Sequence, residues 1–276
     1  MLEIVEILGL PFLACVLMAV VLGYFGIHVL KREVIFVDIS LAQIAAVASI
    51  LAHIIFKSHN DSLTVYILAV GFIVFISAFY ALVRKKITQI SLEAIIGVTY
   101  AVAAATALFL VGVAPGGHIH VQHMLAGTLL WINASEIIWI TIVFSAICLC
   151  VFLCRKPLHA VTQDYQEKLE IGLYKTLWWD FIFYVLLGTV IISAVKIAGI
   201  VVVFAYLIIP AAISFLFARQ TTSQLFIIWV AAILASIGGL LFSYYLDFSV
   251  APSIAALLGV ELILTAIAKK MFINTS

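Results

Sequence analysis

Charged residues are scarce in this chain. Only 10% of its 276 residues are charged, whereas 66% are hydrophobic. No water-soluble domain of this length needs so large an apolar fraction to build its core. Long apolar runs fill almost the whole sequence and leave little room for a soluble domain. The sequence therefore predicts an all-α membrane protein whose main solvent is lipid.

Cysteine is also rare. The sequence holds 4 cysteines, Cys15, Cys148, Cys150 and Cys154, and all lie within apolar runs. Three of them share one run too closely to form a framework of disulfides. We interpret all four as small apolar packing residues.

Sequence signatures of several enzyme classes are missing. No GxxxxGK[ST] loop, which would cradle nucleotide phosphates, occurs in the sequence, and neither does a GxSxG or HExxH motif. We therefore do not expect the chain to be an enzyme or to hydrolyse ATP by itself. Nucleic acid is not expected as a partner either.

Apolar runs about 20 residues long are the length of helix that crosses a bilayer core of about 30 Å. Such runs cover residues 8–30, 35–56, 63–83, 90–113, 136–154, 177–195, 197–217, 225–246 and 252–268. They predict one polytopic membrane domain over residues 1–276. Lys196 alone separates the sixth run from the seventh, so residues 177–217 form either two full spans or one broken helix.

Lysine and arginine set the predicted orientation, because they accumulate in the short cytoplasmic loops of membrane proteins. With the N-terminus outside, all of the 14 basic residues except Lys57 and Lys196 fall on the cytoplasmic side. An odd number of spans then places the C-terminus in the cytoplasm. The acids Glu3 and Glu6 precede the first run, which has no basic leader or small-residue cleavage site, so we expect no cleavable signal peptide.

Three acids stand out inside the predicted spans, where a charge costs at least ~2.5–3.5 kcal/mol. Asp38 and Glu93 both lie roughly 8–10 Å from the cytoplasmic boundary, so they could face one pathway for a cation. The alternative for each is a carboxyl that is protonated or satisfied by a neighbouring polar group. Glu261, near the middle of the last span, fits a protonated structural role as well as a functional one.

A histidine-rich segment, PGGHIHVQH, covers residues 115–123 on the predicted external side and contains His118, His120 and His123. Imidazole is a common ligand for zinc, iron and manganese. The segment therefore predicts a first binding site for an incoming metal. The alternative is a solvated loop, which tolerates histidines freely.

Residues 155–176 make the longest polar interruption on the predicted cytoplasmic side, and we expect a loop that contains a short helix. Asp164 is a candidate N-cap for that helix, and Gly172 a candidate end. The helix would include Tyr165, Lys168 and Leu169. A short projecting helix suits the groove of a partner protein, whereas a simple solvated connector is usually shorter than this.

Five segments, in order along the chain, resemble the permease subunit of bacterial ABC importers for zinc, manganese or iron. They are GIHVLKREVIFVDISLAQIAA (26–46), SLEAIIGVTYAVAAA (91–105), HMLAGTLLWINASEI (123–137), IAGIVVVFAYLIIPAAISFLFA (197–218) and SYYLDFSVAPSIAALLG (243–259). The fourth is similar to the family's most distinctive pattern, VGxLLVxALLxxPAA. In the fifth, Ala251 and Pro252 depart from the order of the family's SxxLDxPSG pattern.

The resemblance implies the cobalamin-importer-like fold of type II ABC importers. It implies a permease homodimer with the pathway between the two copies, two ABC ATPase subunits on the cytoplasmic face and an extracytoplasmic metal-binding protein. Residues 164–172 align with the family's coupling helix, which docks on the ATPase. The implied location is the bacterial cytoplasmic membrane. No permanently bound cofactor is implied, and ATP would bind only to the partner ATPase.

Asp38 matches a carboxylate of the family's metal path. The histidine that commonly follows four residues later is Ala42 here, with Gln43 beside it. Losing an imidazole favours harder ions such as manganese or ferrous iron, although His120 could supply a nitrogen earlier on the path. We expect zinc first, then manganese or iron. The alternative function is a proton-coupled secondary transporter of a cation, in which Asp38 and Glu93 are protonated in turn.

Overall fold

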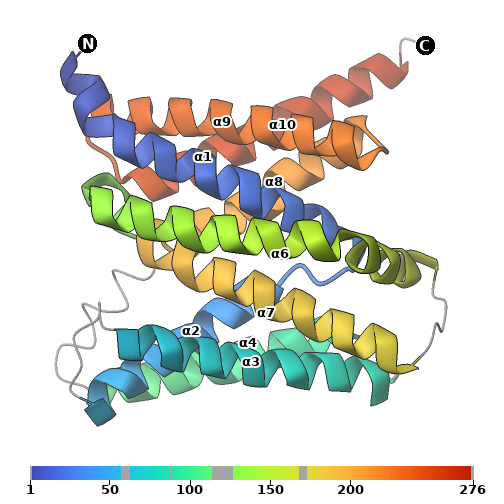
Figure 1. Cartoon of the computed structure of the whole chain (residues 1–276). Helices are drawn as coiled ribbons and strands as arrows, with labels where there is room; N and C mark the ends of the chain where they lie inside the picture. The colour runs from blue at the N-terminus through green and yellow to red at the C-terminus, as the bar shows by residue number, and fades with distance from the viewer. Residues whose placement is uncertain (1, 57–62, 87–88, 114–126, 168–172, 275–276) are drawn as a thin grey trace. The chain divides into compact units, whose positions relative to one another are not determined.

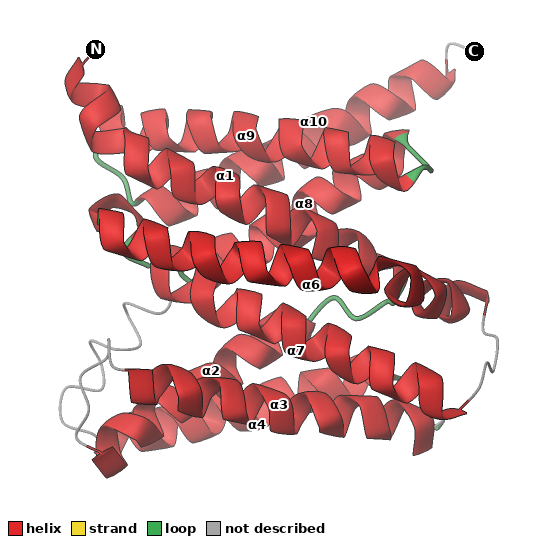
Figure 2. Ribbon diagram, viewed as in Figure 1, coloured by secondary structure: helices red, strands yellow, loops and turns green. Residues whose placement is uncertain are grey.

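The computed structural model describes residues 2–56, 63–86, 89–113, 127–167 and 173–274 (Figure 1). These residues form helices and no strands (Figure 2). The α-helices, numbered as in Figure 1, are α1 (Leu2–Lys31), α2 (Val37–Phe56), α3 (Leu63–Lys86), α4 (Leu92–Val113), α6 (Ala134–Glu167), α7 (Leu173–Ala198), α8 (Ile200–Phe217), α9 (Thr221–Leu246) and α10 (Val250–Asn274). A short 3-10 helix, η1, covers Leu129–Trp131.

Within these described residues, nine helices are long and apolar enough to cross a membrane. This confirms the predicted all-α fold with nine spans. Most helix ends lie a few residues from the predicted ones.

Helix α6 is the exception, because it continues through Glu167, whereas residues 155–176 were predicted to be a loop that contains a short separate helix. The side chains of Leu158, Val161 and Thr162 are all buried. They stand at positions i, i+3 and i+4, so they share one face of the helix, and that face packs inside the protein. That buried face explains why the charged stretch stays helical.

Gly199 separates α7 from α8 and decides between the two interpretations of residues 177–217. It has a φ of 80°, a left-handed conformation that is easily adopted only by glycine. Helix α7 has 26 residues on one side of it, and α8 has 18 residues on the other. Both are long enough to be candidate spans, so the chain has two helices here.

The chain forms two compact units. Unit 1 consists of residues Met1–Leu30, Leu125–Ser145 and Lys196–Ser276, and unit 2 of Lys31–Met124 and Ala146–Val195. Residues 1–276 were predicted to form one membrane domain. Whether the two units together make such a domain stays a prediction.

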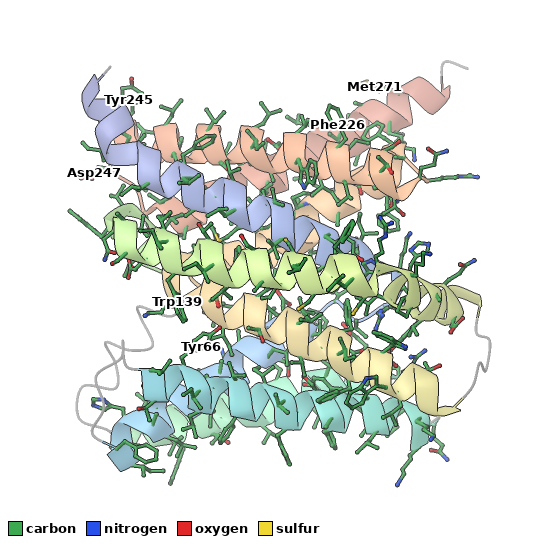
Figure 3. All side chains as sticks on the ribbon, viewed as in Figure 1. Tyr66, Trp139, Phe226, Tyr245, Asp247 and Met271 are labelled. Carbon is green, nitrogen blue, oxygen red and sulfur yellow. The ribbon has the colours of Figure 1, made fainter. Side chains whose placement is uncertain are left out.

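In unit 1, helices α8, α9 and α10 pack against one another (Figure 1). Helix α1 joins them through Gly26, where an added Cβ would collide with the backbone carbonyl oxygen of Leu207 in α8. The outer faces carry large apolar side chains such as Phe226 and Met271, which are 67% and 61% exposed (Figure 3). Exposed side chains of this kind suit a surface that contacts lipid.

In unit 2, helix α2 packs against both α3 and α4 (Figure 1). Small residues allow the close approach, because Ala45 and Ala48 of α2 form a buried cluster with Ala69 of α3. Small side chains are typical of helix contacts within membranes. Unit 2 therefore places α2, which begins with Asp38 in its first turn, at the centre of its helices.

Candidate functional site

Asp38 lies in the first turn of α2 and is only 2% exposed. Its Oδ1 atom is buried and has no hydrogen-bond partner among the described residues. The N-terminus of a helix favours a negative charge, because its free N–H groups point toward it. Even so, a buried carboxylate oxygen without a donor is costly, and it calls for a proton or a cation.

Glu93 lies in the first turn of α4 and contributes to the start of α2. Its Oε1 accepts a hydrogen bond of 3.0 Å from the backbone N–H of Phe36, the residue before α2 begins. Its Oε2 is buried and, among the described residues, has no partner. Glu93 therefore stabilises the start of α2 with one oxygen and leaves the other free for a second role.

Asp38 and Glu93 are near enough to interact electrostatically. Two carboxylates close together in an apolar setting repel each other unless a proton or a cation lies between them. Each also has a buried oxygen with no donor in the described part of the chain. The pair is therefore a candidate site for a transient cation.

The other residues of the predicted metal path lie elsewhere or outside the described residues. Gln43 is half-buried on α2, and five residues of helix rotate it about 140° away from Asp38. His118, His120 and His123 fall outside the described residues. Among those that are described, no three His, Cys, Asp or Glu side chains gather where they could hold a metal.

A buried charge cluster in unit 2 was not anticipated from the sequence. Asp180 of α7, 1% exposed, accepts hydrogen bonds from Arg32 Nη1 at 2.9 Å and from Arg84 Nη1. Arg32 Nε also donates to Thr162 Oγ1 at 3.0 Å. The sequence signal that could have found this cluster was an acid inside an apolar span, because Asp180 lies within the predicted span 177–195.

Aromatic rings enclose the two guanidinium groups of this cluster. The Arg84 guanidinium carbon lies 3.2 Å from the centre of the Tyr165 ring, and that of Arg32 lies 3.8 Å from the centre of the Phe183 ring. Such cation–π contacts favour a charge that has been removed from water. We call Arg32, Arg84, Asp180, Thr162 and Tyr165 the Asp180 cluster.

Two of the predicted coupling residues are described, and both differ from the expectation. Asp164 does not begin a separate helix, because it lies buried within α6. Tyr165 does not project from the protein, because its ring lies against Arg84 and its hydroxyl is 3.3 Å from that of Tyr184. Lys168, Leu169 and Gly172 lie outside the described residues, so their predicted role in docking stays a prediction.

Unit 1 has a smaller buried polar group. The Tyr206 hydroxyl of α8 is hydrogen-bonded to Ser236 Oγ of α9, and Tyr206 also interacts electrostatically with Glu261 of α10. Glu261 Oε2 is buried without a partner in the described part of the chain. This arrangement fits a protonated structural carboxyl.

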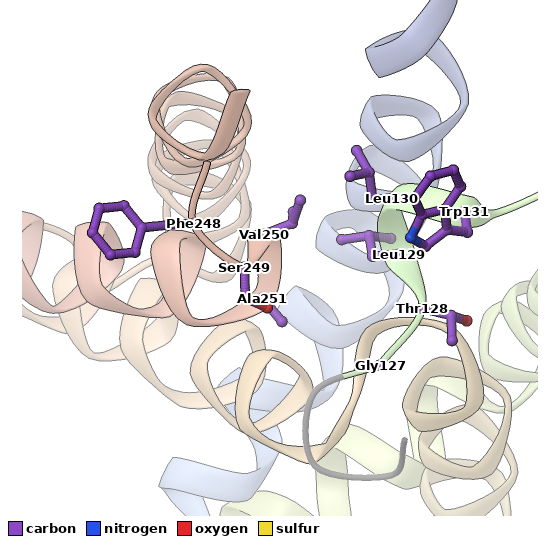
Figure 4. A pocket seen from close by; sticks show the side chains of 9 residues that line it. All are labelled: Gly127, Thr128, Leu129, Leu130, Trp131, Phe248, Ser249, Val250 and Ala251. Carbon is purple, nitrogen blue, oxygen red and sulfur yellow. The ribbon is translucent and has the colours of Figure 1, made fainter. Parts of the chain in front are cut away.

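A pocket of about 160 Å³ also lies in unit 1 (Figure 4). Two short segments line it, residues 127–131 around η1 and residues 248–251 before and within the first turn of α10. Both belong to segments whose sequences resemble the permease family. Among the described residues that line it there is no carboxylate and no imidazole, the side chains that most often bind metals.

Comparisons with known proteins agree with the sequence motifs. The chain is 24% identical to a high-affinity zinc uptake system membrane protein of Haemophilus influenzae, over 90% of this chain and 92% of that protein. It is 29% identical to a manganese import system permease protein of Streptococcus parasanguinis, over 68% and 69% of the two chains. Alignments with several other relatives, among them a chelated iron transport system membrane protein of Yersinia pestis, cover only 55 to 64% of those proteins.

The fold also matches a solved structure. Streptococcus pneumoniae PsaBC, in complex with Fab, has a chain that superposes with a TM-score of 0.78 at 21% identity, over 96% of this chain and 94% of that one. The sequence model of the ABC 3 transport family matches residues 5–270. The chain is thus a multi-pass membrane protein and belongs to the ABC 3 transport family, as a membrane-spanning permease.

Proposed function

We propose that this chain is the permease subunit of an ABC importer that takes up a divalent metal ion. The observation that carries the proposal is the Asp38–Glu93 pair, because each carboxyl keeps one buried oxygen without a donor among the described residues. A metal in transit needs ligands that bind it and also release it. Two carboxylates are a weak, oxygen-only ligand set, and weak binding suits release.

A second copy of the chain would complete the ligand set. Two carboxylates leave most of the four to six coordination positions of a divalent metal unfilled. In a homodimer with the pathway between the copies, Asp38 and Glu93 of both copies would supply four carboxylates. The membership of the family supports this arrangement, with two ABC ATPase subunits and an extracytoplasmic binding protein as partners.

The proposed location is the bacterial cytoplasmic membrane, with the N-terminus outside. In this orientation Asp38, Glu93 and the Asp180 cluster lie near the cytoplasmic ends of their helices. The ATPase would then dock on the connection from α6 to α7, near Asp164 and Leu169.

Which metal is transported depends on whether histidines contribute ligands to the path. With imidazoles from His118, His120 or His123 on the path, zinc is favoured, and we keep it first. With carboxylates alone, manganese or ferrous iron is favoured. Relatives named for zinc and for manganese both occur among the similar proteins.

ATP hydrolysis by the purified complex tests the proposal. The chain would be co-purified with its proposed ABC ATPase and binding-protein partners, and hydrolysis measured with zinc, manganese and ferrous ions. We expect metal-loaded binding protein to stimulate hydrolysis in the wild type and not in Asp38→Asn. Equal hydrolysis with and without metal in the wild type would contradict the proposal.

A further inference from the structure

The Asp180 cluster connects four parts of unit 2 that are distant in sequence. Arg32 follows the end of α1 and leads into α2, and Arg84 lies in the last turn of α3. Asp180 lies near the start of α7, 148 positions from Arg32. Thr162 lies near the end of α6. The cluster therefore joins the ends of α6 and α7, which flank the proposed ATPase dock, to the start of α2 and the end of α3.

The chain segment that connects the Asp180 cluster to the candidate metal site at Asp38 and Glu93 is short. Phe36 lies four positions after Arg32, a distance of at most roughly 14 Å. Glu33 has a φ of 55° and Val34 is buried, so both restrict this segment. Phe36 then donates its N–H to Glu93. A displacement of Arg32 must therefore shift the first turn of α2 or break that hydrogen bond.

A second connection from the Asp180 cluster to the candidate metal site runs along α3. Tyr80 lies one turn before Arg84, so both side chains are on one face of the helix. The Tyr80 hydroxyl is 2.6 Å from Ser40 Oγ, and both residues are fully buried. Ser40 lies two residues after Asp38. A displacement of Arg84 therefore also reaches α2.

Ionic contacts are better suited than an apolar contact to make the joined helix ends move together. Two guanidinium groups and one carboxylate meet in fixed directions through charge-assisted hydrogen bonds. Separating any of them would leave an unpaired charge in an apolar surrounding, which is far more costly than sliding two apolar faces. The helix ends joined by the cluster should therefore move together.

We propose that the Asp180 cluster transmits the movement of the α6 and α7 ends to Asp38 and Glu93. The inference rests on the proposed function, because it assumes that an ATPase docks between α6 and α7. Arg32, Arg84 and Asp180 are positioning residues, since they act on the metal site through α2 and α3 and do not bind the metal. Their task is to couple ATP hydrolysis to opening of the site.

The test measures metal transported per ATP hydrolysed. Complexes of the chain with its ATPase and binding protein would be placed in liposomes, and uptake of zinc and of manganese measured alongside hydrolysis. Asp180→Asn keeps the shape and removes the charge, while Arg32→Lys and Arg84→Lys keep the charge and remove the forked guanidinium. Asp247→Asn and Arg219→Lys make the same changes at exposed positions and serve as controls.

We expect Asp180→Asn, Arg32→Lys and Arg84→Lys to hydrolyse ATP at a rate near that of the wild type. Metal transported per ATP should fall roughly tenfold in all three, within the range of known coupling effects. Asp180→Glu, which restores the charge, should recover part of the ratio. The two control variants should match the wild type, and the metal concentration for half-maximal uptake should stay unchanged in every variant.

Two results would overturn the inference while the proposed function stands. One is an unchanged ratio of metal to ATP in the three cluster variants. The other is a loss of uptake that only follows a loss of assembled complex, with a normal ratio in the complex that remains, since that would mean a purely structural role. An absence of ATP-dependent uptake in the wild type would instead contradict the proposed function itself.

Discussion

Arg32 and Asp180 form an ion pair of 2.9 Å in which both side chains are buried, although 148 positions separate them in the sequence. Arg84 binds the other oxygen of the same carboxylate. The cluster thus contains two positive charges and one negative charge inside an apolar helical unit. Such an arrangement is costly to disrupt, because removing one partner leaves the others uncompensated.

Asp38→Asn should abolish uptake without affecting assembly of the complex. The amide keeps the size of the side chain and loses the negative charge that a cation needs, so we expect uptake to fall at least about tenfold. Uptake of zinc and manganese into liposomes measures the effect, and size-exclusion chromatography measures assembly. Asp247→Asn is the matched control, since Asp247 is exposed at the end of α9 (Figure 3). Normal uptake by Asp38→Asn would remove Asp38 from the path.

Glu93 has two roles that different substitutions separate. Glu93→Gln keeps an oxygen that accepts the Phe36 N–H, whereas Glu93→Ala removes it. We expect Glu93→Ala to lower the free energy of unfolding by about 1 kcal/mol, as for the loss of a helix cap, and Glu93→Gln to lower it less. Thermal unfolding in detergent measures this. Both variants should transport poorly; a Glu93→Gln variant with normal uptake would leave Glu93 with the structural role alone.

Gly26 and Gly9 make a matched pair within α1. A Cβ at Gly26 would collide with the Leu207 carbonyl oxygen, whereas a Cβ at Gly9 would have no atom within 4 Å. Gly26→Ala should therefore destabilise the protein by about 1–3 kcal/mol. Gly9→Ala should be neutral or stabilising by up to about 1 kcal/mol. Equal unfolding temperatures for the two variants would contradict the close packing of α1 on α8.

Replacing Tyr165 and replacing Leu169 with lysine should have different effects. Tyr165 packs against Arg84 and Tyr184 inside unit 2, so Tyr165→Lys should lower the unfolding temperature of the chain alone. Leu169→Lys, in the proposed dock, should leave that temperature unchanged and weaken co-purification of the ATPase. A stable Leu169→Lys complex with normal uptake would show that the docking segment is misplaced.

Much of the fold could be predicted because lipid imposes simple rules on sequence. Each span must be a long apolar helix, so nine apolar runs predicted the nine long helices of the described residues. The acids inside these runs identified Asp38 and Glu93 as exceptional. The hydrogen bond from Phe36 to Glu93 was beyond such rules, because it depends on how α2 and α4 pack.

The Asp180 cluster was missed for a similar reason. Arg32 and Arg84 were interpreted only as cytoplasmic charges that set the orientation, since the charge rule counts residues without regard to burial. In the structure the Arg32 side chain is completely buried and pairs with an acid from a different helix. Only tertiary packing brings the partners together. The length of α6 was underestimated because its charges hid the buried face formed by Leu158, Val161 and Thr162.

The most direct test of the central claim is ATP-dependent metal uptake by the complex reconstituted in liposomes. Uptake of zinc and manganese would be compared between the wild-type ATPase and a variant that binds ATP without hydrolysing it. We predict accumulation of metal only with the active ATPase, ATP and the binding protein. Uptake that persists with the inactive ATPase would contradict an ABC importer and would favour a proton-coupled secondary transporter.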